Sequence, residues 1–349
     1  MNEKAVLKEG DVLRWLARLM EGGPLIAPVR RGRNSCAFDR VERPEAVVLD
    51  YVRTVLPPKQ ALLPPRERLL EFQLAPEPHV APVLDRAPYA LFGVHPCDLA
   101  AIGQLDWAMQ RRHDKSDPHY AARRAAATII GIECLPDEYC FCSSVGTCDT
   151  RAGADLFLTP VAGGYLAEVL SDKGAEALRA APEARAPSAA EGAEAEAWSA
   201  KKAGAITSHL AAEASELPDL LEGRYESALW EETAERCYGC GTCTNVCPTC
   251  FCFDVWEEAD FSLAAGARSR RYDSCQFLEF ALVAGPHNFR PDRPDRARHR
   301  WFRKFVYLNR EYGSPFCVGC GRCSQACTAD IGLVEVLNAA VDEARKEAV

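Results

Sequence analysis

Two cysteine runs with the same spacing constrain this 349-residue chain more than any other feature. The first reads CYGCGTCTNVCP and the second CVGCGRCSQAC, so both follow C-x2-C-x2-C-x3-C, and a threonine follows the second run where proline follows the first. Bacterial ferredoxins hold 4Fe-4S clusters with this spacing, and the fourth cysteine of each run ligates the other cluster. We therefore predict two such clusters, one held by Cys237, Cys240, Cys243 and Cys327, the other by Cys317, Cys320, Cys323 and Cys247.

Zinc is the alternative occupant of the runs, because C-x2-C pairs also bind that ion. Four thiolates spaced by two, two and three residues are hard to fit around one tetrahedral ion, whereas a cubane accepts them. Gly239, Gly241, Gly319 and Gly321 lie between the cysteines. We expect these glycines to let the loops turn their backbone N–H groups toward cluster sulfurs. The runs therefore favour iron-sulfur clusters.

The cysteine count and the composition indicate a reducing compartment. The chain has 17 cysteines, too many for chance and too few for a disulfide scaffold of this length. Its first 21 residues lack the continuous apolar segment of a secretory signal, and its longest apolar run, 125–132, is too short to cross a bilayer. A net charge of -9 argues against a nucleic acid partner. We expect a cytoplasmic protein that partners neither a membrane nor a nucleic acid.

One basic segment runs against this acidic balance. Its members are Arg290, Arg293, Arg296, Arg298, Arg300, Arg303 and Lys304. Because Asp292 and Asp295 are interleaved, we expect mainly a solvated or internally paired structural stretch. A docking surface, or a counter-charge for an anionic cluster, is the alternative.

The N-terminal half has the pattern of an α/β domain. Apolar residues in 4–21 recur with near-helical spacing, which predicts a helix. Residues 24–29 and 35–41 are typical of a β-hairpin. Two apolar runs, 89–95 and 127–133, flank a helical stretch, which predicts parallel strands joined by a crossover helix.

A further group of cysteines lies in this half. Cys97 follows the first of these two strands and Cys134 the second, and Cys140 and Cys142 come shortly afterwards. Parallel strands end at the same edge of a sheet, so the four thiols can meet around a third cluster although no ferredoxin spacing is present.

The remaining cysteines carry no motif: they are Cys36, Cys148, Cys250, Cys252 and Cys275. For the last three, burial as small hydrophobic residues is the simple interpretation. Packing on a cluster, or service as an alternate ligand, is the other. The sequence has no G-x-G-x-x-G after a strand, no Walker loop and no nucleophile elbow, so we expect no flavin or nicotinamide on this chain.

The second half is expected to be largely helical. Residues 172–205 are rich in alanine and glutamate and are typical of surface helices or a connector, and a helix is predicted over about 206–234. The stretch 253–316, between the runs, is expected to be a long helical insert. We thus predict an α+β chain: an α/β domain over 1–200, followed by a largely helical, ferredoxin-like domain over 201–349.

Segments between about residues 50 and 335 resemble the beta subunits of soluble NiFe hydrogenases of the sulfhydrogenase type, together with the related iron-sulfur subunit of anaerobic sulfite reductase. The matching segments are VLPPKQALLPPRE, FGVHPCDLAAI, IGIECLPDEYCFCSSVGT, CYGCGTCTNVCPTCFCFDV, YDSC, AGPHNFRPDRPDRARHRWFRKF and FCVGCGRCSQAC. The resemblance implies that the N-terminal α/β domain itself bears a cluster. Cys97, Cys134, Cys140 and Cys142 match the family's pattern there, which strengthens the expectation of a third 4Fe-4S cluster.

The resemblance also implies a heteromeric complex. One partner would carry FAD and NAD(P), and others would carry a NiFe site, or siroheme in the sulfite reductase case. We expect this chain to relay single electrons between the flavoprotein and the catalytic metal subunit, with no acid or base residue of its own. Two alternatives are a self-contained flavin-dependent oxidoreductase and a scaffold whose clusters only hold the fold.

Overall fold

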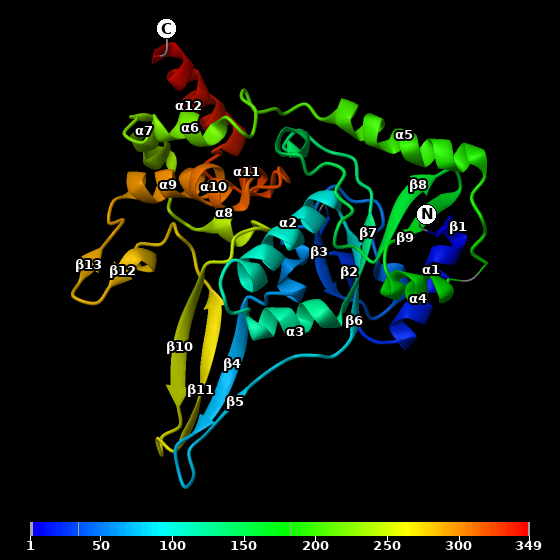
Figure 1. Cartoon of the computed structure of the whole chain (residues 1–349), viewed down its shortest axis with the longest axis horizontal. Helices are drawn as coiled ribbons and strands as arrows, with labels where there is room; N and C mark the ends of the chain where they lie inside the picture. The colour runs from blue at the N-terminus through cyan, green and yellow to red at the C-terminus, as the bar shows by residue number, and fades with distance from the viewer. Residues whose placement is uncertain (1–2, 34, 182, 348–349) are drawn as a thin grey trace.

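The computed structural model describes residues 3–33, 35–181 and 183–347 (Figure 1). Its larger sheet has seven strands in the order β1-β9-β8-β7-β6-β2-β3. These strands are β1 (Lys4–Lys8), β2 (Leu25–Arg30), β3 (Cys36–Arg40), β6 (Tyr89–Val94), β7 (Ala127–Ile132), β8 (Leu156–Val161) and β9 (Gly164–Val169). The four central strands β2, β6, β7 and β8 run parallel, and the edges are antiparallel. The predicted hairpin (β2–β3) and the predicted parallel pair (β6–β7) are both confirmed.

Helices cover both faces of this sheet, which explains why its central strands are almost continuously apolar. Phe92 and Ile130 face a core formed with α1 (Glu9–Glu21) and α4 (Asp172–Arg179). Their neighbours Leu91 and Ile129 face the opposite core, formed with α2 (Pro96–Asp106) and α3 (Pro118–Ala126). The long helix α5 (Ala189–Ala205) lies along β8 and β9 (Figure 1).

The helix predicted over 4–21 is wrong at its start. Residues 4–8 form the edge strand β1, and the helix begins only at Glu9. Ala5, Val6 and Leu7 are consecutive and all buried, which suits a strand covered on both faces better than one stripe of a helix. Pairing with β9, more than 150 residues away, therefore overrides the local periodicity.

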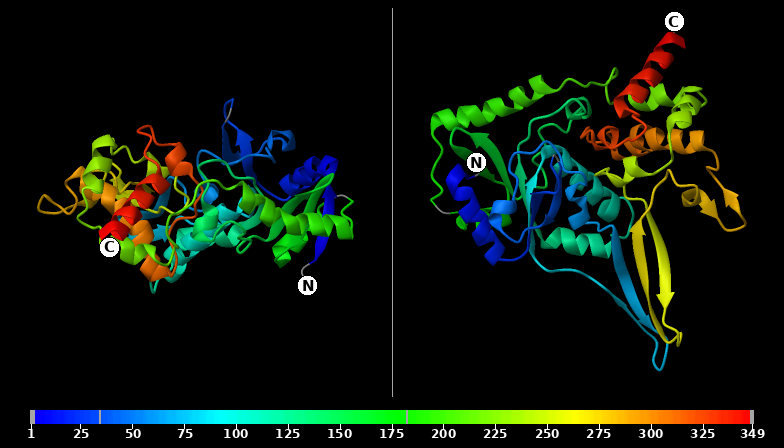
Figure 2. Two further views of the ribbon diagram at one scale, coloured as in Figure 1. Left: turned by 90° about the horizontal axis from the view of Figure 1, so that it is seen from above. Right: turned by 180° about the vertical axis from the view of Figure 1, so that it is seen from behind.

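A second sheet has four antiparallel strands in the order β10-β11-β4-β5 and projects from the rest of the molecule (Figure 2). Its strands are β4 (Arg66–Gln73), β5 (His79–Pro82), β10 (Phe253–Ala259) and β11 (Ala265–Tyr272). The prediction of a helical insert over 253–316 is therefore wrong in its first part. Aromatic and β-branched residues favour the strand β10 locally, but the partner strand β4 comes from the other half of the chain.

The helical part is built from short elements rather than from the continuous helix predicted over 206–234. It contains α6 (Leu217–Glu222), α7 (Leu229–Arg236), α8 (Thr242–Asn245), α9 (Arg293–Phe302), α10 (Leu308–Tyr312), α11 (Arg322–Gln325) and α12 (Leu333–Glu347). Pro218 begins α6 and Gly223 ends it, so one helix cannot run through. Trp230, Trp301 and Leu337 lie in its common core.

The remaining elements are small. Two short strands, β12 (Leu282–Val283) and β13 (His287–Asn288), form a hairpin, and single turns of 3-10 or π helix are η1 (Pro44–Ala46), η2 (Pro58–Ala61), η3 (Trp107–Arg111), η4 (Cys142–Val145), η5 (Glu279–Ala281) and η6 (Arg303–Tyr307). The division into domains near residue 200 stays a prediction; residue 200 lies within α5, and the four-stranded sheet takes strands from both sides. Among the described residues, no helix has the length and apolar character needed to cross a membrane.

Candidate iron-sulfur sites

Each ferredoxin run forms a loop that ends in a short helix, and the two loops have nearly the same backbone. Gly241 has φ of 73° before α8, and Gly321 has φ of 72° before α11, which is the left-handed region that favours glycine. The two short helices pack against each other. The chain thus places the two runs side by side, as a pair of clusters that exchange their fourth ligands requires.

The thiols of the runs influence one another as the predicted ligand sets require. Burial raises the pKa of Cys317 to about 12, and Cys323 and Cys247 raise it further. Burial likewise raises the pKa of Cys320 to about 11, and the same two thiols add to it. In the other predicted set, Cys237 acts on Cys243, and Cys237 and Cys327 pack against one hydrophobic core. Iron binding deprotonates such thiols outright, so their raised pKa values do not oppose ligation.

Two residues of the basic segment are buried among these thiols. Lys304 Nζ donates to Cys247 Sγ at 3.2 Å and to Thr249 Oγ1 at 2.9 Å. Burial opposes the charge of Lys304, but the Cys247 and Cys250 thiolates outweigh it and raise the pKa of Lys304 overall. Burial also opposes the charge of Arg300, and thiolates led by Cys243 raise its pKa overall. These two residues are therefore counter-charges, the alternative named for the basic segment.

Other residues of the basic segment are internally paired, in line with the first interpretation. Arg298 donates to Asp295 at 2.7 Å and stacks on Tyr225 at 3.8 Å. Arg296 donates to backbone carbonyls of Gln276 and Arg290. The basic segment thus has two roles, one at the clusters and one in the fold.

Replacing Lys304 by methionine should lower the reduction potential of the cluster that Cys247 would bind. Reduction adds a negative charge, and the buried ammonium stabilises it; methionine keeps the length of the side chain without the charge. A shift on the order of 50–100 mV follows from one charge at an effective dielectric constant of about 20. Potentiometric titration followed by EPR measures it, with Lys346→Met, an exposed lysine of α12, as control. An unchanged potential in Lys304→Met would remove the counter-charge role.

Five cysteines of the N-terminal half line a single cavity of about 410 Å³. Cys97 opens α2 directly after β6, and Cys134 follows β7, so the ends of two parallel strands deliver them. Cys140 and Cys142 come from the loop around η4. Cys148, which the sequence left spare, lines the cavity as well and shares a hydrogen bond with Cys142. The structure thus brings the four expected thiols together and adds a fifth.

Buried cations surround this cavity. Arg53 donates to Cys140 Sγ at 3.2 Å and pairs with Asp137. Lys202 of α5 donates to Glu133 at 2.6 Å and also lines the cavity. An enclosed, thiol-rich site with cations beside it suits an anionic iron-sulfur cluster in both its donor atoms and its charge. The residues present therefore fit a third cluster.

The loop of the second run forms one wall of the same cavity. Cys320 and Gly319 line it, and Gly319 O accepts from Phe141 N at 2.8 Å. Arg322, in the same loop, makes a bidentate ion pair with Asp98 of α2 at 2.7 Å for both contacts, and both side chains are buried. A buried pair of this kind fixes the loop against α2, because separating the partners would leave an uncompensated charge.

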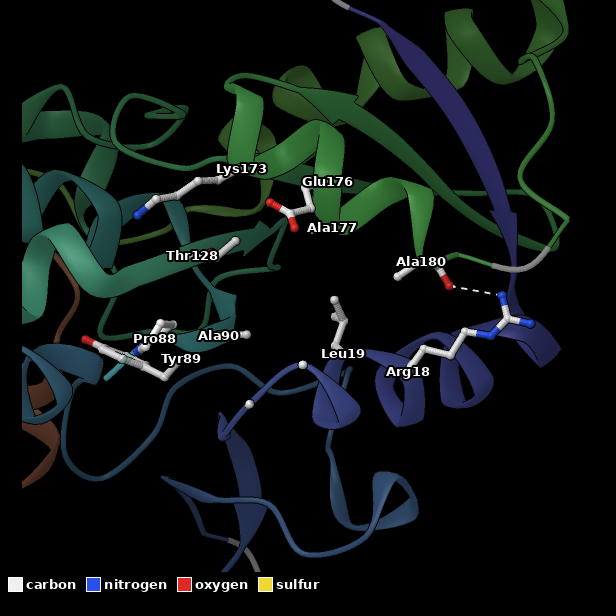
Figure 3. Close-up of a pocket in the computed structure, with 12 residues that line it drawn as sticks. Arg18, Leu19, Pro88, Tyr89, Ala90, Thr128, Lys173, Glu176, Ala177 and Ala180 are labelled. Atoms are coloured by element: carbon white, nitrogen blue, oxygen red, sulfur yellow. Dashed lines mark hydrogen bonds between the residues drawn. The ribbon is translucent and has the colours of Figure 1, made fainter. Parts of the chain in front are cut away.

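A pocket between α1 and α4 lies away from all of these thiols (Figure 3). Ala90 and Thr128 line it near the beginnings of β6 and β7, with Arg18 and Lys173 at its rim. Ligand sites of parallel sheets gather at the carboxyl ends of the strands, where the cysteines lie. We therefore assign no function to this pocket.

Sequence reasoning missed Cys148, Asp98, Arg322 and Lys202 as parts of these sites. Asp98 directly follows Cys97, and Arg322 stands between two ligand positions of the second run, so their closeness to cysteines was the available signal. Lys202 had no such signal, since it comes from an alanine-rich helix distant in sequence. Among the residues that the structure describes, no three His, Cys, Asp or Glu side chains form a group that could hold a metal ion; a cubane is bound differently, each thiolate contacting another iron.

Comparison with known proteins places these sites among relatives. The family model of the 4Fe-4S dicluster domain matches residues 236–331, which include both ferredoxin runs. The chain is 41% identical over 325 residues to a protein of Pyrococcus furiosus named sulfhydrogenase 2 subunit beta, and the match covers 92% of this chain and 93% of that protein. No solved structure matches the chain.

Proposed function

We propose, from the premise that this chain belongs to the family of sulfhydrogenase beta subunits, that it is the iron-sulfur relay of a multisubunit oxidoreductase. The observation that carries the proposal is the wall shared by two groups of cysteines. Cys320 of the second run lines the same cavity as Cys97 and Cys134. A ligand of one cluster would then lie beside the ligands of the next, which is the positioning that a protein contributes to electron transfer.

The chain's own residues hold, insulate and neutralise in this proposal. The two ferredoxin runs would hold two clusters, and four of the five cysteines around the N-terminal cavity would hold the third. Arg300 and Lys304 would offset negative charge at the runs, as Arg53 and Lys202 would at the cavity. When bound, the clusters supply the one-electron redox change, which no side chain here supplies.

One end of the relay would be the loop of the first run. Cys240 is exposed, whereas the other 16 cysteines, all within the described ranges, are buried or half-buried. Tyr238 beside it is 69% exposed. A partner's cofactor can approach the cluster most closely where its ligand loop reaches the surface. The cavity beneath α5 would be the other end.

We propose two kinds of partner for these ends: a flavoprotein that binds FAD and NAD(P), and a catalytic metal subunit of the NiFe hydrogenase type. The second candidate for the catalytic partner is a siroheme sulfite reductase. Neither a flavin nor a nicotinamide is expected on this chain. The relay would operate in the cytoplasm.

Purification of the intact complex from its native cells, through a tag on this chain, tests the proposal. Nickel in the copurifying subunits supports the hydrogenase assignment, and siroheme absorbance supports the alternative. After dissociation, flavin should leave with a partner. Flavin that stays with this chain, or a chain that copurifies with no redox partner, would contradict the relay.

A further inference from the structure

Two cysteines outside the predicted ligand sets meet at the base of the β10–β11 hairpin. Cys252 immediately precedes β10, and Cys275 lies three residues after β11. The last ladder pair joins Phe253 to Tyr272, and Asp273 N continues the ladder by donating to Cys252 O at 3.0 Å. The strand register therefore sets the two cysteines opposite each other.

The contacts of the pair distinguish its two sulfurs. Cys252 Sγ accepts hydrogen bonds from both the thiol and the backbone N–H of Cys275. Gln276 Nε2 donates to Cys275 Sγ at 3.6 Å. Cys252 is half-buried, and Cys275 is only 3% exposed. One sulfur is thus reachable from solvent, with the second directly behind it.

Positive charge lies beside the reachable sulfur. The hydrogen bond from Cys275 is the main cause that lowers the pKa of Cys252 to about 6; Arg303 and Lys304 add to this, against burial. A thiolate with a resolving thiol in contact is the arrangement that reacts by thiol–disulfide exchange.

We propose that Cys252 and Cys275 form a thiol–disulfide exchange site that accepts small-molecule disulfides. This goes beyond the relay, which uses neither residue. The Cys252 thiolate attacks one sulfur of a disulfide RSSR, forms a mixed disulfide and releases RS⁻. Cys275 then loses its proton and attacks Cys252 Sγ, which forms the Cys252–Cys275 disulfide and releases a second RS⁻. The disulfide RSSR is reduced by two electrons, and the cysteine pair is oxidised by two.

The test exposes the full chain, with its clusters loaded, to oxidised glutathione without oxygen. Alkylation and peptide mass spectrometry then locate each disulfide. In the wild type we expect Cys252 linked to Cys275, and dithiothreitol should reverse the link. Cys275→Ser should trap glutathione on Cys252, and Cys252→Ser should leave Cys275 unmodified. Cys36→Ser, at a buried cysteine of β3, is the matched control and should behave as the wild type.

Two further readouts separate this site from a cluster ligand and from a surface thiol. Iron content should be the same in all four proteins, and Cys252 should react at least about tenfold faster than Cys36. Loss of about four irons in Cys252→Ser would make the residue a cluster ligand and overturn the proposal. So would a wild-type chain in which both thiols stay free, a measurement that needs no variant to fold.

Discussion

Replacing Cys134 by serine is expected to reduce the iron content from about twelve to about eight atoms per chain, because the third of three 4Fe-4S clusters is lost. Cys134 is half-buried in the cavity that four other cysteines line, so serine removes a thiolate without altering the surface. Iron and acid-labile sulfide analysis of the purified, reconstituted chain measures the loss.

The same experiment decides which thiols of the cavity act. Cys148→Ser should keep about twelve irons if Cys97, Cys134, Cys140 and Cys142 are the ligands, and Cys36→Ser should keep them in any case. A wild-type chain with only about eight irons would remove the third site altogether. The ferredoxin runs would then stand alone.

Replacing Gly319 by alanine is expected to destabilise the contact between the second run and the N-terminal cavity by about 2–4 kcal/mol. Gly319 has φ of 63°, and an added Cβ would lie 2.5 Å from both Cα and N of Cys142. Backbone atoms cannot rotate away as a flexible side chain can, so one of the two loops must move. The apparent midpoint of urea unfolding should fall, and the third cluster should be lost first.

Gly146→Ala is the matched control for this substitution. Gly146 has a similar φ of 71° but no atom within 4 Å of an added Cβ. It should therefore cost only the backbone strain, about 1 kcal/mol, and keep its iron. If the two variants unfold at the same urea concentration, the two loops do not pack as described.

The local pattern of this sequence was enough for the strands and loops that carry the cysteines. Alternation and apolar runs predict β2, β3, β6 and β7 because each is a short segment bounded by turn residues. The C-x2-C-x2-C-x3-C spacing predicts the loops of the runs, since it is itself a local geometric requirement. Non-local pairing was invisible. The strand β1 and the sheet of β10, β11 and β4 depend on partners far along the chain.

The candidate sites show the same division. Cys97 and Cys134 could be placed together because both follow parallel strands, but nothing in the spacing shows that Cys148 folds back toward them. The charges of the sites were the least predictable part. Lys304 and Arg322 occur among many basic residues, and only burial next to sulfur or a carboxylate distinguishes them from solvated ones.

The proposed relay depends on three clusters held close together in one chain. EPR spin quantification of the fully reduced chain, combined with iron analysis of the same sample, is the decisive measurement. Three neighbouring clusters should give about three unpaired spins and about twelve irons, with spectra broadened by coupling between the clusters and fully recovered after reoxidation. About two spins with about eight irons, or clusters that cannot be reduced reversibly, would contradict the relay.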